Sequence, residues 1–281
     1  TVDGASGGQD IDMALDLLFE HSNTPPFVSK LLIQRMVKSN PSPEYIERVA
    51  SVFVNNGEGV RGDLSAVVKA ILLDEEARHC SWIEDVSSGK MREPMMRYMQ
   101  LLKSFNASNQ SGKMWSVGWM AQEMGQHPMA APTVFNFFLP TYAPSGPISD
   151  SSLVAPEFEL LNSANSIKYI NLIADMCFGG IYMESITMAH PDDIGIPWWG
   201  VGINSPEDNV TLDFEDEIIL ASNDVQAMVD RLNILLAGGT ASSETLDTIS
   251  TLIDVEGIAP ADRVKLALYL LLISPDYIIQ K

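Results

Sequence analysis

The chain has 281 residues, 46% of them hydrophobic, which is enough to bury a sizeable core in one large domain or two ordinary ones. Its 17 Lys and Arg residues stand against 37 Asp and Glu. The resulting formal net charge of −20 argues against a nucleic-acid partner or an anionic membrane surface, since both need basic residues. The longest apolar run, residues 266–273, is too short to span a bilayer. We therefore expect an acidic, folded protein with no membrane span.

The chain begins at Thr1 rather than Met and has no charged segment followed by an apolar one, so we recognise no signal peptide. We expect either a processed protein or part of a longer polypeptide. The two cysteines, Cys80 and Cys177, allow one disulfide or two buried thiols. Neither stands in a CxxC or a metal-ligand spacing.

Apolar side chains recur at helical spacing along most of the chain, and capping residues mark where helices begin. Ser42, for example, precedes Pro43, after which Ile46, Val49 and Phe53 form one stripe. A Gly/Ser-rich, linker-like segment covers residues 1–9. We predict helices over residues 10–20, 24–39, 43–54, 63–72, 94–105, 115–124, 156–178, 181–189, 223–237, 243–254 and 260–273, with at most a short strand at 210–212.

The last three predicted helices repeat three early ones at an offset of 200 residues without a gap. Ser42 recurs as Ser242 and Gly57 as Gly257, and the apolar stripes coincide. Chance agreement of amphipathic helices is the alternative, but one register through three helices and a glycine turn favours a duplicated unit. We therefore predict an all-α fold, a multi-helix domain with two related three-helix units flanking a loop-rich centre. The first helical unit covers residues 10–80, the central inserted region 90–220 and the second helical unit 221–281.

The rest of the chain is organised around residues 124–174. Proline and glycine surround its Phe-Asn-Phe-Phe run, and a long ordered loop is where a helical scaffold usually carries function. The densest polar set on this otherwise apolar sequence is Gln126, Asn136, Glu157, Asn162, Asn165 and Tyr169. Asn162, Asn165 and Tyr169 share one helical face and could line the wall of a binding cleft. Alternatively, the amides satisfy backbone groups of the loop.

His127 is the best single candidate for a ligand or proton carrier, although a loop histidine also bonds readily to nearby backbone. Glu157 follows Pro156 in the first turn of a predicted helix, where a carboxylate stabilises the helix N-terminus. A catalytic role for Glu157 would need a second carboxylate. Trp198 and Trp199 could form an aromatic platform for a sugar or a partner, or close a long loop over the protein.

No catalytic or cofactor motif occurs in the sequence. It contains no HExxH, no GxSxG elbow, no P-loop and no GxGxxG after a strand. The acidic runs at 192–193, 207–208 and 213–217 lack the spacing of an EF-hand loop. We therefore expect no metal site and no cofactor.

Several short motifs resemble, in the same order, those of a bacterial family. They lie at residues 31–35, 39–43, 61–63, 70–74, 92–94, 125–126, 134–138, 153–158 and 274–277. The family they resemble, over nearly the whole chain, is the "domain of unknown function 1800" family. The resemblance implies a predominantly helical, secreted or periplasmic bacterial protein, with this chain as the C-terminal half of a longer one. It also implies a partner resembling the "domain of unknown function 1501" family, and it carries over no catalytic residue.

Two functions follow as expectations. The first is a binding or assembly module that acts with a partner protein and with the N-terminal half of its own polypeptide, through the aromatic, proline-rich centre. The alternative is a hydrolytic enzyme with a cleft around residues 125–169, using Gln126, His127, Asn136 and Glu157. A pocket at the loop would be needed for the enzyme, and an exposed apolar face would favour the binding module.

Overall fold

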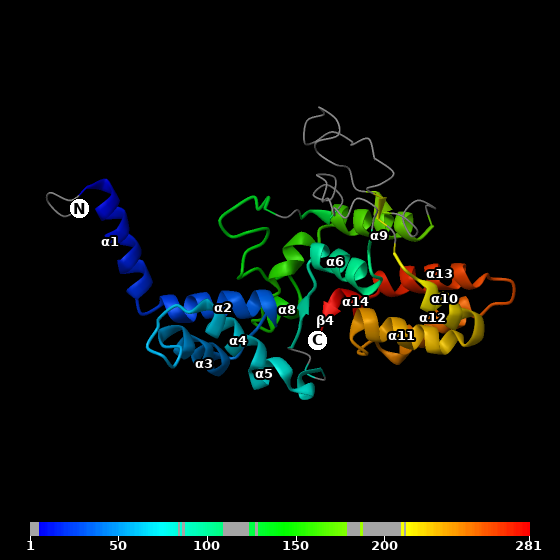
Figure 1. The fold of residues 1–281 in the computed structure, drawn as a ribbon, viewed down its shortest axis with the longest axis horizontal. Helices are drawn as coiled ribbons and strands as arrows, with labels where there is room; N and C mark the ends of the chain where they lie inside the picture. The colour runs from blue at the N-terminus through cyan, green and yellow to red at the C-terminus, as the bar shows by residue number, and fades with distance from the viewer. Residues whose placement is uncertain are drawn as a thin grey trace, which may run out of the picture. The chain divides into compact units, whose positions relative to one another are not determined.

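The computed structural model describes residues 6–83, 85, 88–108, 124–126, 129–178, 186–187, 209–210 and 212–281 (Figure 1). Contacts within the chain divide it into two compact units. The first comprises residues 1–90, 151–154 and 281, and the second comprises 91–150 and 155–280. Within the described residues every strand is only two residues long, so the predicted all-α fold is confirmed. No helix among them combines the length and apolar character that a bilayer span requires.

The first unit is built on three helices that pack against one another, with Ile33 and Tyr45 among its fully buried side chains. The hydroxyl of Tyr45 donates to the carbonyl of Ile71 at 2.7 Å and so joins the second of these helices to the third. In chain order the elements are α1 (Gly7–Glu20), α2 (Thr24–Met36), α3 (Pro43–Val54), α4 (Leu64–Leu73), α5 (Glu75–Arg78) and the 3₁₀ turn η1 (Cys80–Ile83).

Local capping explains where these helices start. The hydroxyl of Ser42 accepts from the backbone N–H of Tyr45 at the start of α3, and the carboxylate of Asp63 does the same for Ser65 at the start of α4. Both starts agree with the sequence prediction. The first helix begins at Gly7 rather than at residue 10, because Ser6 and Gln9 form a reciprocal capping box.

The second unit contains more elements. They are β1 (Lys90–Met91), α6 (Pro94–Ser104), α8 (Pro147–Asp150), η2 (Pro156–Leu160), α9 (Ser163–Phe178), β2 (Ile186–Thr187), β3 (Asn209–Val210), α10 (Glu215–Asn223), α11 (Val225–Ala237), α12 (Ser243–Ile253), α13 (Pro260–Leu272), α14 (Pro275–Ile278) and β4 (Ile279–Gln280). Strand β4 pairs with β1, and β2 pairs with β3 in antiparallel register.

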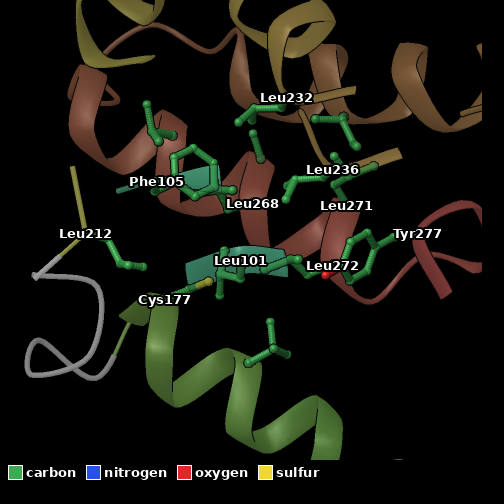
Figure 2. Close-up of a cluster of buried hydrophobic side chains, with 14 of the residues drawn as sticks. Leu101, Phe105, Cys177, Leu212, Leu232, Leu236, Leu268, Leu271, Leu272 and Tyr277 are labelled. Carbon is green, nitrogen blue, oxygen red and sulfur yellow. The ribbon is translucent and has the colours of Figure 1, made fainter. Parts of the chain in front are cut away.

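One hydrophobic core holds the helices of the second unit together (Figure 2). Leu101 on α6, Cys177 on α9, Leu232 on α11, Leu268 on α13 and Tyr277 on α14 all contribute to it, and each is at most 1% exposed. Burying such side chains contributes about 1.5–3 kcal/mol each. The core therefore fixes the positions of α6 and α9. Helix α9 carries the predicted residues Asn165 and Tyr169, and α6 is contacted by Gln126.

Three further predicted helices differ from those observed. Within the helix expected over 181–189, the described residues 186–187 form strand β2, and the helix expected over 115–124 lies outside the described residues except for Met124. The helix expected over residues 156–178 is the short η2 followed by α9, because the side chain of Asn162 accepts from the N–H of Asn165 and starts a new helix there. The helix expected over 223–237 is α11 alone, capped by Asp224. It is preceded by α10, a helix that was not predicted.

The two units carry the same succession of helices at the 200-residue offset. Helix α3 begins at Pro43 and α12 at Ser243, and α5 begins at Glu75 and α14 at Pro275. In both units the first of the three helices packs on the second and third, the second packs on the third, and the third contacts the short helix that follows. The intervening turns agree as well, with Gly57 at φ 96° and Gly257 at φ 92°. A common origin by duplication stays a prediction.

Candidate functional site

A pocket of about 320 Å³ lies at the start of α6 in the second unit. Its wall is mostly apolar and rich in methionine, and it includes two of the predicted site residues, Gln126 and Asn136. The lining residues are Glu93, Met95, Met96, Gln126, Met129, Ala131, Asn136 and Phe137. A volume of this size is at the lower end for a small-molecule site and has room for one or two side chains of a partner.

Gln126 joins the central loop to the start of α6. Its side-chain oxygen accepts from the N–H of Met95 at 3.1 Å, and its amide nitrogen donates to the carboxylate of Glu93. Gln126 is only 5% exposed. Since Glu93 makes no capping bond with its own side chain, Gln126 satisfies a free N–H of the helix from outside. The expectation that a loop amide satisfies backbone groups fits this residue.

Gly125 lets the loop pass closely against α9. Its φ is +68°, and a Cβ atom there would lie 2.5 Å from the side-chain nitrogen of Asn165. That nitrogen cannot move freely because it donates to the carbonyl of Leu160 at 3.1 Å. The left-handed backbone therefore favours glycine at this position, and the close approach to Asn165 leaves no room for a Cβ atom.

We expect Gly125→Ala to destabilise the second unit by more than Gly238→Ala. Gly238 in the same unit has nearly the same φ, +64°, but a Cβ there would meet nothing within 4 Å. Gly238→Ala should lower the unfolding free energy only through the left-handed conformation, by about 1–2 kcal/mol. Gly125→Ala should lower it by about 1–3 kcal/mol more, because the added methyl group overpacks against Asn165. Urea unfolding of both variants measures the difference, and equal costs would show that Asn165 yields without penalty.

The loop after the pocket is held in shape by its own hydrogen bonds. The N–H of Asn136, whose φ is 71°, donates to the carbonyl of Thr133 at 3.1 Å, and the hydroxyl of Thr133 accepts from the N–H of Phe135. At the far end the N–H of Leu139 donates to the carboxylate of Glu159 in η2 at 2.6 Å. The loop is therefore tied to the helical part of the unit at a defined point.

The same loop exposes large apolar side chains that either line the pocket or precede the lining residues Asn136 and Phe137 in the sequence. Val134 is 95% exposed and Phe135 55%, and Met129, which lines the pocket, is fully exposed. On the helix side Met96 is 59% exposed and also lines the pocket. We call the exposed side chains of Met96, Met129, Val134 and Phe135 the pocket rim.

The other predicted site residues lie elsewhere or outside the described residues. Glu157 is 1% exposed within η2 and is not among the residues that line the pocket. Asn162 is an exposed residue that caps α9, and Asn165 contacts Gly125. His127, Trp198 and Trp199 lie outside the described residues.

Tyr169 is buried and serves a contact that the sequence did not indicate. The guanidinium carbon of Arg97 lies 3.9 Å from the centre of its ring, and its hydroxyl donates to the carbonyl of Leu272 at 3.1 Å. Burial raises the pKa of Tyr169, and the positive charge of Arg97 offsets only part of this effect. The hydroxyl of Tyr277 on α14 donates to the carbonyl of Arg97 at 2.6 Å. Arg97 on α6 therefore contacts both α9 and α14.

Sequence reasoning missed the apolar part of the site. It did not predict that methionines of α6 would be exposed, but Met96 is 59% and Met99 39% exposed. One signal was present: Tyr98, Leu102 and Phe105 form a helical stripe that is buried, and Met96 and Met99 fall outside it. An apolar residue off the buried stripe of a helix is a candidate contact residue.

The cysteines do not pair. Cys80 is exposed and Cys177 is buried, and both are free thiols. Burial raises the pKa of the Cys177 thiol to about 12, so Cys177 stays protonated and unreactive at neutral pH. Within the described part of the chain, no three histidine, cysteine or acidic side chains gather closely enough to hold a metal ion.

Comparison with known proteins gives one match. The model of the family described as "Protein of unknown function (DUF1800)" matches residues 1–279, essentially the whole chain, so the expected restriction of the resemblance to a C-terminal half was wrong. Neither the curated proteins nor the solved structures contain a match to it.

Proposed function

We propose that this chain, which belongs to the DUF1800 family, is a protein-binding module whose pocket at the start of α6 receives an apolar side chain of a partner. The observation that carries the proposal is the combination of a methionine-lined pocket with the exposed apolar side chains of the pocket rim. Exposed apolar patches next to a cavity are typical of protein interaction sites, where one or two buried anchor residues supply most of the binding energy.

The chemistry of the wall supports a protein partner. Met95, Met96 and Met129 offer flexible, polarisable side chains that adapt to the shape of an inserted group, and Phe137 adds an aromatic surface. Val134 and Phe135 lie outside the pocket and are positioned by the turn at Thr133. A loop that is ordered before binding loses less conformational entropy when the partner docks.

The hydrolytic alternative receives less support from the same geometry. It requires two groups that can exchange protons or attack a bond, yet among the described residues of the pocket wall only Glu93 carries a carboxylate. The amide of Gln126 holds that carboxylate while also capping α6. Glu157, the other acidic candidate, is not part of the pocket wall.

We further propose an exported bacterial protein as the partner. The resemblance stated above makes a protein similar to the "domain of unknown function 1501" family the first candidate, and makes secretion or the periplasm the expected location. The following experiment tests the identity of the partner.

The experiment places a photo-crosslinking amino acid at Val134 in the intact protein, expressed in its native bacterium. The control position is Ile234 on α11, which is 67% exposed on the same unit but belongs to neither the pocket nor its rim. We expect one dominant protein adduct at position 134 that is missing at position 234. Equal adducts at both positions, or none at 134 together with turnover of a polymer or ester by the purified protein, would overturn the proposal.

A further inference from the structure

The second unit covers a surface that its counterpart in the first unit leaves open. Helix α10 packs against both α11 and α13. On α10, Ala221 is fully buried and Glu217 is 2% exposed. The guanidinium of Arg231 on α11 donates to the carboxylate of Glu217 at 2.6 Å, and Arg263 on α13 donates to the carbonyl of Ala221 at 3.3 Å. An ion pair and a backbone contact therefore hold α10 in place.

In the first unit, helices α2 and α4 occupy the places of α11 and α13 in the shared succession, and α1 precedes α2 as α10 precedes α11. At the 200-residue offset, Glu217 corresponds to Leu17 and Arg231 to Leu31. Both members of the ion pair are thus replaced by leucine. A matched exchange of this kind preserves a contact between two helices while changing its chemistry from ionic to apolar.

Yet helix α1 buries none of its residues, and Figure 1 shows it standing off from α2–α4. Leu17 is 74% exposed, and Ile11, Leu15 and Leu18 are each about 60% exposed or more. Asp12, Asp16 and Glu20 share one face of this helix, and most of its apolar residues lie on the other side, which is typical of a helix that packs on one side. Its own capping box at Ser6 defines its start without any tertiary contact.

The surface that would receive α1 is open as well. Phe27, one turn before Leu31 on α2, is 57% exposed. Leu64 at the start of α4 is 55% exposed, whereas the residue at the corresponding place in α13, Val264, is 1% exposed. We call Phe27, Leu31 and Leu64 the α2–α4 surface.

We propose that the α2–α4 surface is the docking surface for α1 of the same chain, with Leu17 placed against Leu31. The order of the helices favours α1 of the same molecule, because α10 also covers the two helices that follow it in its own chain. Only residues 21–23 join α1 to α2, so α1 must turn about this connection. The anchor is confined to the last turn of α1. There the hydroxyl of Thr24 donates to the carbonyl of Leu18, Arg61 donates to the carbonyl of Phe19 and pairs with Glu20, and the ring of Phe19 lies 6.0 Å from that of Phe53.

The first test is a disulfide trap in the full chain. Leu17→Cys and Leu31→Cys are combined in a Cys80→Ser background, because Cys80 is exposed, and the protein is treated with a mild oxidant such as diamide. The oxidant accepts the two thiol hydrogens as the sulfur–sulfur bond forms. We expect an intramolecular disulfide in most molecules, and at least tenfold less with the control pair Leu17→Cys and Lys30→Cys, since Lys30 is an exposed neighbour of Leu31.

The second test transfers the ion pair of the second unit into the first. Leu17→Glu and Leu31→Arg are made singly and together, and amide hydrogen exchange of α1 is measured. Each single variant should lower the protection of α1 at least tenfold, and the double variant should restore it to within threefold of the wild type. A disulfide between two copies, no disulfide at all, or a double variant no better protected than the singles would each overturn the proposal.

Discussion

Replacing Glu76 with alanine should lower the unfolding free energy of the first unit by about 3–5 kcal/mol, because it leaves the buried ammonium of Lys38 without its carboxylate partner. Glu76 is 8% exposed, and its carboxylate accepts from the ammonium of Lys38 at 3.1 Å, where both side chains are 7% exposed. It also accepts from the N–H of Ser42 at 3.0 Å and from the Ser42 hydroxyl. One carboxylate thus compensates a buried cation and fixes the residue that caps α3.

The second unit supplies a matched control. Asp276, at the 200-residue offset from Glu76, accepts from the N–H of Ser242 at 3.2 Å and from its hydroxyl at 2.8 Å, in an exposed setting. The position of Lys38 is taken by Gly238, so the variant Asp276→Ala leaves no lysine behind there. We expect Asp276→Ala to cost about 1 kcal/mol, the usual effect of a weakened cap. Urea unfolding compares the two variants, and similar costs would contradict a special role for Lys38.

The Glu76 contribution should also depend on pH. Burial by itself would raise the pKa of Glu76, but the hydrogen bonds from Ser42 and Lys38 outweigh it, so the pKa is lowered from its ordinary value of 4.5. A lowered pKa means that the carboxylate contributes stability in full above pH 4.5 and loses it as the pH falls through the lower folded value. The difference in stability between wild type and Glu76→Ala should therefore be largest near pH 7 and shrink at pH 3.

The variant Met96→Asp should weaken binding of the crosslinked partner at least about thirtyfold, since loss of a central apolar contact costs about 2 kcal/mol or more. Met96 lines the pocket and is 59% exposed, so the substitution places a charge in the interface without disturbing the core of the unit. Titration calorimetry with the partner identified at Val134 measures the affinity. An unchanged thermal unfolding midpoint would confirm that the variant is folded.

Helix α6 offers the control for this experiment. Met99 is also exposed, at 39%, and lies on the same helix, but it does not line the pocket. We expect Met99→Asp to change the affinity less than about threefold, as for a residue at the edge of an interface. If both variants weaken binding equally, the contact surface follows the helix rather than the pocket.

A feature of the fold could be predicted from the sequence when the residues that determine it lie close together in the chain. Ser42 and Asp63 cap their helices through residues two or three positions away, so those helix starts could be read directly. The prediction of one helix over residues 156–178 was wrong for a local reason as well. Pro156 and Glu157 resemble the start of a long helix but begin the short η2, and Asn162 then caps α9.

The candidate site depends on contacts that no local pattern contains. Gln126 bonds to Met95 and Glu93, about thirty residues earlier in the chain, and Leu139 bonds to Glu159 twenty residues later. Residue type predicted Gln126 and Asn136 as candidate site residues, and both line the pocket, but it could not show that methionines from α6 would also line it. Long-range pairing, not propensity, positions these side chains.

The central claim is that the loop beside the pocket is ordered before any partner binds, and amide hydrogen exchange of the free protein tests it most directly. The N–H groups of Asn136, Leu139 and Tyr142 donate to Thr133, Glu159 and Leu139 respectively. We predict that these three amides exchange at least about a hundredfold more slowly than in an unstructured peptide, and that Glu159→Ala removes the protection of Leu139. Exchange of all three at unstructured rates in the wild-type protein would contradict the claim.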